Sequence, residues 1–428
     1  MTTALVLSRY FPYDSQMVLG VHQRLGTQVQ ALAKVVDRVD CLFLQPVDQY
    51  YAPEVIQQHE ERLRRLWSPT VSIRLAPTLV DDEPPTLWQR RGRGVFDFHA
   101  QRIARPANTE ATFDAVNAAV DARPDIILAH RLSSMCVLMA IARKAPGKTR
   151  RSPLFFDLDD IEHVTWSRRL LHNPGWPAER LQLLQVPRLM LGELQAIRLA
   201  TATFVCSEAD RRYLARFPGT DHVQTVPNSV NFPLLDDSDA SEPLVLFVGT
   251  MGYQPNIQAV DLLVQEIWPA VHARVPAARL VIIGPGREQT ASYHSADESV
   301  TFTGFVDDLQ SWYRRARVMC CPIRHGGGTR VKIIEAAAHA KAIVSTRLGA
   351  EGLNFEDGRE IILRDAPAQL AEACVRLLVD QQVAAKLGKA ARQKAHGTYE
   401  RGAVVDQLAG IFARAAPSTS AVVFIAEP

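Results

Sequence analysis

The sequence lacks the features that mark several classes of protein. Its formal net charge is only +2 over 428 residues, so the bulk composition carries no basic footprint for nucleic acid. Its six cysteines form neither a CxxC pair nor a cysteine–histidine cluster, which argues against zinc and favours a reducing compartment. No apolar run is long enough to cross a bilayer, and residues 1–8 resemble a first strand more than a signal peptide. We therefore expect a cytoplasmic protein without nucleic-acid partners, with peripheral contact to the inner membrane surface left open.

What is present is a long chain of ordinary globular composition. Hydrophobic residues make up 47% and charged residues 22% of the 428 positions, which suits two domains better than one core. Short apolar runs alternate with amphipathic stretches, beginning with a strand at 4–7, a helix at about 21–36 and a strand at 40–44. This alternation predicts an α/β fold with parallel sheets.

An acidic, serine-containing linker separates two halves of the chain. We predict a first domain over 1–235, a second over 236–415 and a short tail over 416–428. Residues 48–107 interrupt the alternation with proline, glycine and runs of arginine, so they are predicted to form a partly helical insertion on the rim of the first sheet. Arginine interleaved with aromatic residues fits a phosphorylated acceptor or a lipid surface, and a solvated helix pair fits equally well.

The most informative stretch joins a buried strand to a glycine loop and a helix. The strand Val318–Cys321 leads to three consecutive glycines: Gly326, Gly327 and Gly328. Thr329 is the expected N-cap of the helix. Arg330 and Lys332 then lie in the first turn, where the helix dipole disfavours cations. Uncovered amides, the dipole and two cations together predict a phosphate or diphosphate site, in preference to a solvated basic helix end.

Polar residues also follow two predicted strands of the first half. His130 comes directly after the strand at 125–129, at the carboxyl end where open α/β sheets bind ligands. A functional and a structural role are equally expected for it. Asp157, Asp159 and Asp160 end a strand near 154–158 and are predicted to order the loop and cap the next helix. A metal is the weaker alternative because no second ligand cluster is present, so neither a metal nor a cofactor is predicted.

Several segments resemble the family 4 glycosyltransferases. In the second half these are GGTRVKIIEA at 327–336, IVST at 343–346, GAEGL at 349–353, FTGFVDDL at 302–309, and FVG at 247–249 followed by PN at 255–256. In the first half they are DLDDIE at 157–162, VCSEAD at 205–210 and VPN at 226–228. The resemblance covers most of the chain and is strongest over 244–355.

This resemblance implies the GT-B architecture, in which two Rossmann-like, doubly wound domains face a cleft and the C-terminal helix crosses back to the first domain. It implies metal-independent, retaining transfer of a sugar from a nucleotide-diphosphate donor. The acceptor would be a carbohydrate or a lipid-linked sugar in polysaccharide or glycolipid synthesis. A GT-B-shaped sugar-nucleotide epimerase and a non-catalytic nucleotide-sugar-binding module are the alternatives.

The resemblance also implies roles for individual residues. Arg330 and Lys332 would hold the diphosphate and stabilise the leaving group, and His130 would contact the transferred sugar. Glu335 would bind the ribose hydroxyls. The loop bordering the base and the residues that let the donor approach would complete the donor site: Gly20, Gly249, Gly304, Phe305, Val306, Gly326, Gly327, Gly328 and Thr329.

The chain departs from the family pattern at two places. Gly327 stands where many members carry a glutamate, eight residues before the position of Glu335, so contacts to the outer hydroxyls of the sugar must come from elsewhere. Many members also carry an Arg-Lys pair after the strand that ends here at Gly249, whereas this chain has Tyr253 to Asn256. Arg330 and Lys332 are expected to supply that missing charge.

Overall fold

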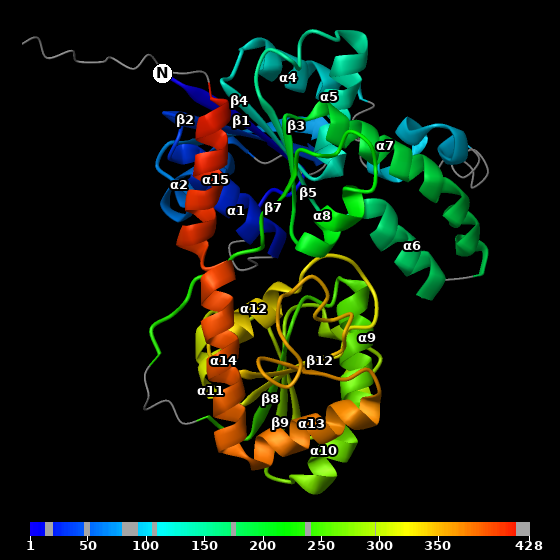
Figure 1. Ribbon diagram of the computed structural model, residues 1–428, viewed down its shortest axis with the longest axis vertical. Helices are drawn as coiled ribbons and strands as arrows, with labels where there is room; N and C mark the ends of the chain where they lie inside the picture. Colours follow the sequence, from blue (N-terminus) through cyan, green and yellow to red (C-terminus); the bar gives the residue numbers. More distant parts are fainter. Residues whose placement is uncertain are drawn as a thin grey trace, which may run out of the picture.

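The computed structural model describes residues 1–12, 20–46, 52–78, 93–104, 109–172, 177–235, 241–295 and 297–416. Two domains stand one above the other in Figure 1, each built on a sheet flanked by helices. The first sheet has the order β3-β2-β1-β4-β5-β6-β7 and the second the order β10-β9-β8-β11-β12-β13. The described strand pairs are all parallel. Both sheets therefore wind outward in two directions from their first strand, which confirms the predicted doubly wound α/β class.

The first domain alternates strands and helices from its start. Its strands are β1 (Thr3–Ser8), β2 (Arg38–Pro46), β3 (Val71–Thr78), β4 (Ile126–His130), β5 (Leu154–Asp159), β6 (Ala202–Val205) and β7 (Val223–Thr225). Its helices include α1 (Gly20–Ala33), α2 (Pro53–Leu66), α4 (Glu110–Asp121), α5 (Leu132–Lys144), α6 (Glu162–His172), η4 (Pro177–Gln185), α7 (Val186–Leu199) and α8 (Glu208–Leu214). Every position of β4 and β5 is buried, because helices cover both faces of a parallel sheet.

Residues 53–78 are a regular part of this sheet, so the prediction of an insertion is wrong for them. Helix α2 connects β2 to β3, and β3 pairs in parallel with β2 over its whole length. As the edge strand, β3 buries only part of its residues and tolerates Arg74 and Pro77. Those residues hid the strand in the sequence. Residues 48–51, 79–92 and 105–107 of the predicted insertion lie outside the described residues.

The second domain repeats the scheme. Its strands are β8 (Leu244–Val248), β9 (Arg279–Ile283), β10 (Val300–Gly304), β11 (Val318–Cys321), β12 (Ala342–Ser345) and β13 (Ile362–Leu363). Its helices include α9 (Gln254–Leu262), α10 (Trp268–Arg274), α11 (Leu309–Arg315), α12 (Val331–Ala338), α13 (Pro367–Val379) and α14 (Gln381–Tyr399). Among the described helices of the whole chain, none is both long and apolar enough to span a membrane.

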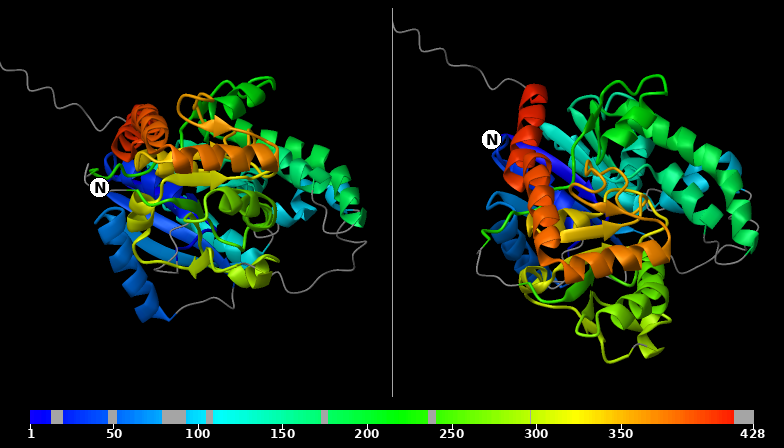
Figure 2. Two further views of the ribbon diagram at one scale, coloured as in Figure 1. Left: turned by 90° about the horizontal axis from the view of Figure 1, so that it is seen from below. Right: turned by 60° about the horizontal axis from the view of Figure 1, so that its bottom comes forward.

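The chain returns to the first domain through α15 (Arg401–Ala415), as predicted. Figures 1 and 2 show α14 and α15 end to end, in the orange and red part of the colour scale, bridging the two domains. Val230 in the linker fixes the crossing, because its N–H donates to the Tyr399 carbonyl (3.0 Å) and its carbonyl accepts from the Arg401 N–H (3.1 Å). The predicted tail lies outside the described residues from position 417 onward.

The packing of α15 gives a test of this arrangement. Phe412 is fully buried, and its ring packs edge-on against two others. The centroid distance is 4.8 Å to the ring of Phe155 of β5 and 6.0 Å to the ring of Phe204 of β6. We expect Phe412→Ala to lower the free energy of unfolding by about 3–5 kcal/mol, since it leaves a cavity in the first domain's core. Chemical denaturation measures this. Val379→Ala, at an exposed position on α13, is the control, and equal stability of the two variants would contradict a structural role for α15.

Candidate functional site

Each sheet reverses its direction of winding at one point, and the two points meet at the domain interface. The reversal lies between β1 and β4 in the first sheet and between β8 and β11 in the second. Ligands of doubly wound sheets bind at the carboxyl edge of such a point. Ser8 and His130 end β1 and β4, whereas β11 leads to residues 326–329, which we call the glycine loop. A side chain carbon at Gly20 of α1 would lie only 3.2 Å from Val331, the first residue of α12.

The glycine loop adopts a backbone that requires glycine. Gly326 and Gly328 have φ values of +110° and +70°, a region that other residues rarely adopt. Helix α12 begins at Val331 with Arg330 as its N-cap, and no side chain caps it. The prediction of Thr329 as N-cap is therefore wrong by one residue. The hydroxyl of Thr329 instead accepts a hydrogen bond from the Asn228 amide in the first domain, at 2.8 Å.

The first domain occupies the space above the glycine loop. A Cβ atom at Gly327 would lie 1.9 Å from the Thr165 hydroxyl oxygen, and one at Gly328 would lie 1.9 Å from an Asp160 carboxylate oxygen. No side chain fits at position 327 while the domains are arranged in this way. The start of α6 thus fills the place where the family resemblance led us to expect a glutamate.

Arg330 is buried beneath the loop with part of its guanidinium unsatisfied. It is 6% exposed, and its Nη1 donates to the carbonyls of Gly327 and Gly328. Its Nε and Nη2 are buried without a hydrogen-bond partner. A buried donor without an acceptor is costly, and the three N–H groups on these two nitrogens have the chemistry to bind an anion.

Lys332 lies in the first turn of α12, next to the end of β8. Its Nζ donates to Asn256 Oδ1 at 2.7 Å and lies 4.1 Å from the centre of the Phe247 ring. Burial lowers its pKa to about 8, because a charged ammonium is poorly solvated there. A Cβ atom at Gly249 would lie 2.7 Å from Nζ, so a glycine at this position leaves room for the ammonium.

Glu335 borders a cavity of about 390 Å³ between the two domains. One carboxylate oxygen accepts from the Tyr313 hydroxyl (3.0 Å) and the other from the Gln23 amide of α1 (3.2 Å). Burial raises its pKa. The cavity is also lined by residues 307–310, which directly follow the predicted base-binding loop Gly304, Phe305 and Val306. Gly304 has a φ of +70° and open space on its side-chain face.

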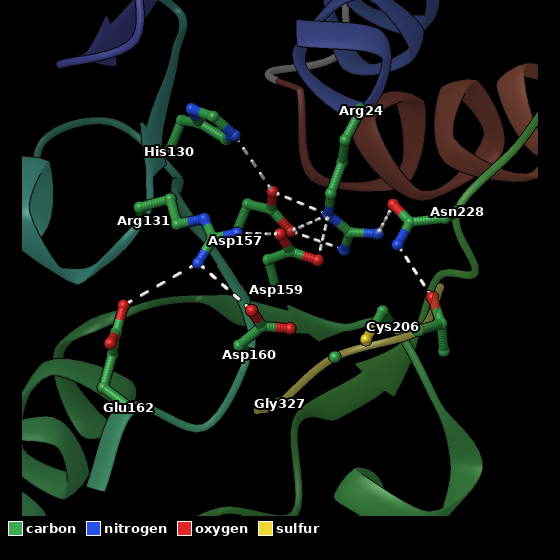
Figure 3. Close-up of polar contacts among 12 residues, drawn as sticks. Arg24, His130, Arg131, Asp157, Asp159, Asp160, Glu162, Cys206, Asn228 and Gly327 are labelled. Carbon is green, nitrogen blue, oxygen red and sulfur yellow. Dashed lines mark hydrogen bonds and ion pairs between the residues drawn. The ribbon is translucent and has the colours of Figure 1, made fainter. Parts of the chain in front are cut away.

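A buried charge cluster underlies the first domain's side of the interface (Figure 3). Arg24 of α1 forms a bidentate ion pair with Asp157, with Nη2 2.6 Å from Oδ1, and lies 3.4 Å from Asp159. Arg131 binds Asp159 at 2.6 Å and Asp160 at 3.4 Å. The aspartates therefore bind arginines and do not cap α6 as predicted. The N–H of Glu162 at the start of that helix donates to a carboxylate oxygen of Glu193 instead, at 2.7 Å.

Two residues of the cluster carry an unusual backbone. Arg131 and Asp159, at the ends of β4 and β5, have φ values of +69° and +61° although neither is glycine. Such conformations persist only where the surrounding structure enforces them, and they gather at functional sites. Here the Arg131 N–H donates to the Asp157 carbonyl at 2.7 Å. The ion pair between the side chains of Arg131 and Asp159 is a second contact between the ends of β4 and β5.

Asp159, Asp160 and Cys206 place one ligand atom each within 4.8 Å of one another, the geometry of a candidate metal group. Their chemistry fits an arginine clamp better. Arg131 already engages both carboxylates, and burial raises the pKa of the Cys206 thiol well above its usual value, which disfavours the thiolate that binds metals. The absence of a metal remains a prediction.

His130 is fully buried at the end of β4. Its Nδ1 lies 2.9 Å from the Ser8 hydroxyl oxygen, and its Nε2 lies 3.8 Å from an Asp157 oxygen without forming a hydrogen bond. Burial lowers its pKa well below the usual value, so the ring is neutral at physiological pH. Nearby, burial and the charge of Asp159 raise the pKa of Asp160 to about 6, and burial raises that of Glu162 to about 7.

Sequence reasoning missed three contributors to this site. Arg24 lies within a helix that was correctly expected, and its partner Asp157 is 133 positions away. Arg131 follows the predicted His130, but no local pattern marks its backbone conformation. Asn256 was noted only in the comparison with the family pattern, yet it accepts the hydrogen bond from Lys332. Long-range pairing of this kind leaves no periodic signal in the sequence.

The fold and the site together define a class. Two doubly wound domains that meet at their switch points, joined by a returning C-terminal helix, make the chain a GT-B protein. Residues 242–380 match the family model described as "Glycosyl transferases group 1". This match lies within the second domain.

Two curated relatives match part of the chain. A phosphatidyl-myo-inositol mannosyltransferase of Mycolicibacterium smegmatis is 30% identical over 203 residues, which cover 44% of this chain and 51% of the relative. An uncharacterized 44.6 kDa protein in the cps region of Klebsiella pneumoniae is 24% identical over 136 residues, which cover 30% of this chain and 35% of that relative. The matched part thus spans about half or less of the length of these relatives.

Solved structures resemble the whole chain. HepE of Anabaena in complex with UDP and glucose superimposes with a TM-score of 0.63 at 15% identity, covering 97% of this chain and 100% of that one. Sucrose-phosphate synthase of Thermosynechococcus elongatus superimposes with a TM-score of 0.68 at 18% identity. The match covers 97% of this chain and 99% of that one. TarM of S. aureus in complex with UDP superimposes with a TM-score of 0.67 at 10% identity. The match covers 96% of this chain and 100% of that one. These likenesses establish the fold.

The buried ammonium of Lys332 generates a prediction on pH. Its folded pKa of about 8 lies below the ordinary 10.5, so between these values the unfolded chain binds more protons than the folded one. Stability from this group therefore rises with pH across that window and is lowest below pH 8. We expect Lys332→Met to gain stability over the parent at pH 7 and to lose that advantage between pH 8 and 10.5. Urea denaturation at each pH measures this, and parallel pH profiles would contradict a buried Lys332.

Proposed function

We propose that the protein is a glycosyltransferase that moves a sugar from a nucleotide-diphosphate donor to a carbohydrate or lipid-linked acceptor. The observation that carries the proposal is the half-satisfied guanidinium of Arg330 beneath the glycine loop, with the Lys332 ammonium in the same helical turn. A diphosphate offers the acceptor oxygens that these donors lack. Glu335, one turn further at the wall of the interdomain cavity, is suited to accept hydrogen bonds from ribose hydroxyls.

The chemistry asked of these residues is mainly electrostatic. Cleavage of the sugar–phosphate bond leaves negative charge on the diphosphate, and the two cations stabilise that charge in a site with little water. This supply of positive charge supports transfer without a metal. We further propose that the configuration at the sugar is retained, with an oxygen of the leaving phosphate taking the acceptor's proton. The neutral His130 would hold a hydroxyl of the transferred sugar.

The relatives also bear on the acceptor and the cellular location. A phosphatidyl-myo-inositol mannosyltransferase is among the relatives, which supports an acceptor carried on a lipid. A protein acting on such an acceptor would work at the cytoplasmic face of a membrane, attached to its surface. The neighbours solved with UDP make UDP and UDP-sugars the first donors to test.

The experiment that tests the proposal follows the fate of the donor. Release of UDP, GDP or ADP from its sugar only when a saccharide or glycolipid acceptor is present would establish transfer. Conversion of the donor's sugar into its epimer, with no acceptor present, would establish the alternative of an epimerase. Tight binding without turnover would establish a non-catalytic module.

We predict that Lys332→Ala and Glu335→Ala weaken donor binding without unfolding the protein. A nucleotide at about one hundred times its dissociation constant adds about 2.7 kcal/mol to the stability of the parent, and each variant should lose most of that gain. Thermal shift with and without the nucleotide measures this. Glu298→Ala, at an exposed position, should retain the gain, and a full gain in both site variants would mean that the donor binds elsewhere.

We predict that His130→Ala leaves nucleotide affinity largely unchanged and lowers turnover, because an interaction made only in the transition state acts on kcat, by about a hundredfold, the scale for losing one hydrogen bond to developing charge. Ser8→Ala removes only the hydrogen bond to Nδ1 and should have a smaller effect. Steady-state rates at saturating donor, with circular dichroism to check folding, separate the two. Unchanged turnover in a folded His130→Ala variant would remove this residue from the site.

A further inference from the structure

The interdomain cavity beside Glu335 is lined by a buried histidine that the proposed function does not use. His339 is the C-cap of α12, and only 6% of it is exposed. Its Nε2 atom is buried and has no hydrogen-bond partner among the residues that the structure describes. A buried polar atom without a partner is costly, so this nitrogen indicates that a ligand completes the cavity wall.

The protein holds the His339 ring in one orientation. Its Nδ1 lies 2.8 Å from the backbone carbonyl oxygen of Glu335. A carbonyl oxygen can only accept, so Nδ1 carries the proton and Nε2 presents a lone pair. The ring also stacks on Tyr313, with 4.8 Å between the centroids and 18° between the planes. Burial lowers the pKa of His339 to about 4, so at physiological pH the ring is neutral and Nε2 is a fixed hydrogen-bond acceptor.

The carboxylate of Glu335 has only part of its capacity left for a ligand. Its two oxygens already accept hydrogen bonds from the Tyr313 hydroxyl and the Gln23 amide. Two neighbouring hydroxyls of one ligand would have to share the lone pairs that remain. His339 follows Glu335 by four positions, which places both on one face of α12, and both line the cavity. The cavity wall therefore offers two acceptors about one turn apart.

A third polar group in this wall is a donor. Arg401, the first residue of α15, lines the same cavity, and its Nε is buried without a hydrogen-bond partner in the described part of the chain. The Glu335 carboxylate would repel a phosphate group, and the Arg401 guanidinium would repel an amine. Hydroxyl groups suit the wall better, because each one both donates and accepts. The cavity therefore favours a neutral group that carries neighbouring hydroxyls.

We propose that His339 is a specificity-determining residue that binds one ribose hydroxyl of the nucleotide donor, while Glu335 binds the other. The order of groups along α12 supports this. The two cations lie at the start of the helix, Glu335 follows about one turn later, and His339 lies one turn further. A nucleoside diphosphate along this helix would have its diphosphate at the first turn and its ribose over the next two. The diphosphate site and the role of Glu335 rest on the proposed function, and His339 is the addition.

The division of the two hydroxyls between two residues makes the cavity selective for ribose. A ligand without its 2′- or 3′-hydroxyl leaves one acceptor of the wall buried and unsatisfied. Sites built to bind a hydroxyl reject analogues that lack it for this reason. The protein should therefore prefer ribonucleoside diphosphates to both deoxy forms.

Isothermal titration of nucleotides into the full chain tests this role. UDP, GDP and ADP are compared first, and the tightest of them is then compared with its 2′-deoxy and 3′-deoxy forms. We expect each deoxy form to bind the parent about tenfold more weakly, the scale of one hydrogen bond. His339→Asn keeps a donor for the Glu335 carbonyl and removes the acceptor at Nε2. It should bind the ribonucleotide about tenfold more weakly than the parent does, and it should no longer discriminate against one of the two deoxy forms.

Two further variants are controls. His339→Gln places an amide oxygen near the position of Nε2 and should recover most of the lost affinity. His272→Asn replaces a histidine of α10 that stacks on Trp268 at 5.8 Å between centroids and does not line the cavity. This variant should bind every nucleotide like the parent. Circular dichroism checks that each variant is folded.

Three results would overturn the role of His339 and leave the nucleotide site standing. The parent could bind the deoxy forms as tightly as the ribonucleotide. His339→Asn could bind the ribonucleotide like the parent, or it could weaken all three ligands equally, which a merely structural role would produce. A fourth result, a parent that binds none of UDP, GDP and ADP, would reject the proposed function and the role of His339 together.

Discussion

The site depends on the buried ion pair between Arg24 and Asp157. Arg24 reaches across from α1 to the end of β5, and its Nη1 also donates to the Val226 carbonyl at 2.9 Å and to the Asn228 side chain at 3.3 Å. Asn228 in turn donates to Thr329 of the glycine loop. One guanidinium thus connects the first sheet, the linker and the loop of the second domain. Removing either partner of such a pair leaves an uncompensated buried charge, which typically costs about 3–5 kcal/mol.

The anion site shows the opposite situation, a set of charges that the protein alone does not satisfy. Arg330 and Lys332 lie at the positive end of α12, where the helix dipole opposes them, and the guanidinium retains two buried nitrogens whose N–H groups have no acceptor. Natural proteins sacrifice stability in this way where a ligand completes the site. The same positions that weaken the empty protein would strengthen the complex with a diphosphate.

The two domains meet through small and specific contacts around this site. Thr165 and Asp160 lie against the glycine loop, and Arg168 of α6 forms a bidentate ion pair with Glu351 after β12. Gln23 reaches Glu335 from α1. Helix α15 then joins the domains by burying Phe412 in the first core. Helix α6 therefore takes part in the domain interface and also in the arm that it forms with α7.

Local sequence was sufficient for the parts of the protein that local physics controls. The alternation of apolar runs and amphipathic stretches predicted two parallel sheets, and the strand, glycine loop and helix of 318–338 were found where the pattern placed them. So was His130, at the carboxyl end of a strand. Here chain periodicity, glycine's freedom at positive φ and the helix dipole act within a few residues of one another.

Contacts between distant residues settled the rest. Thr329 is not the expected N-cap, and its hydroxyl instead accepts a hydrogen bond from Asn228, 101 positions earlier in the chain. A side chain at position 327 has no room, because Thr165 of the other domain occupies that space. The aspartates after β5 bind Arg24 and Arg131, and the supposed insertion at 53–78 is an edge strand and its helix. Each of these depends on which surfaces come together, and periodicity within one segment holds no information about its partner.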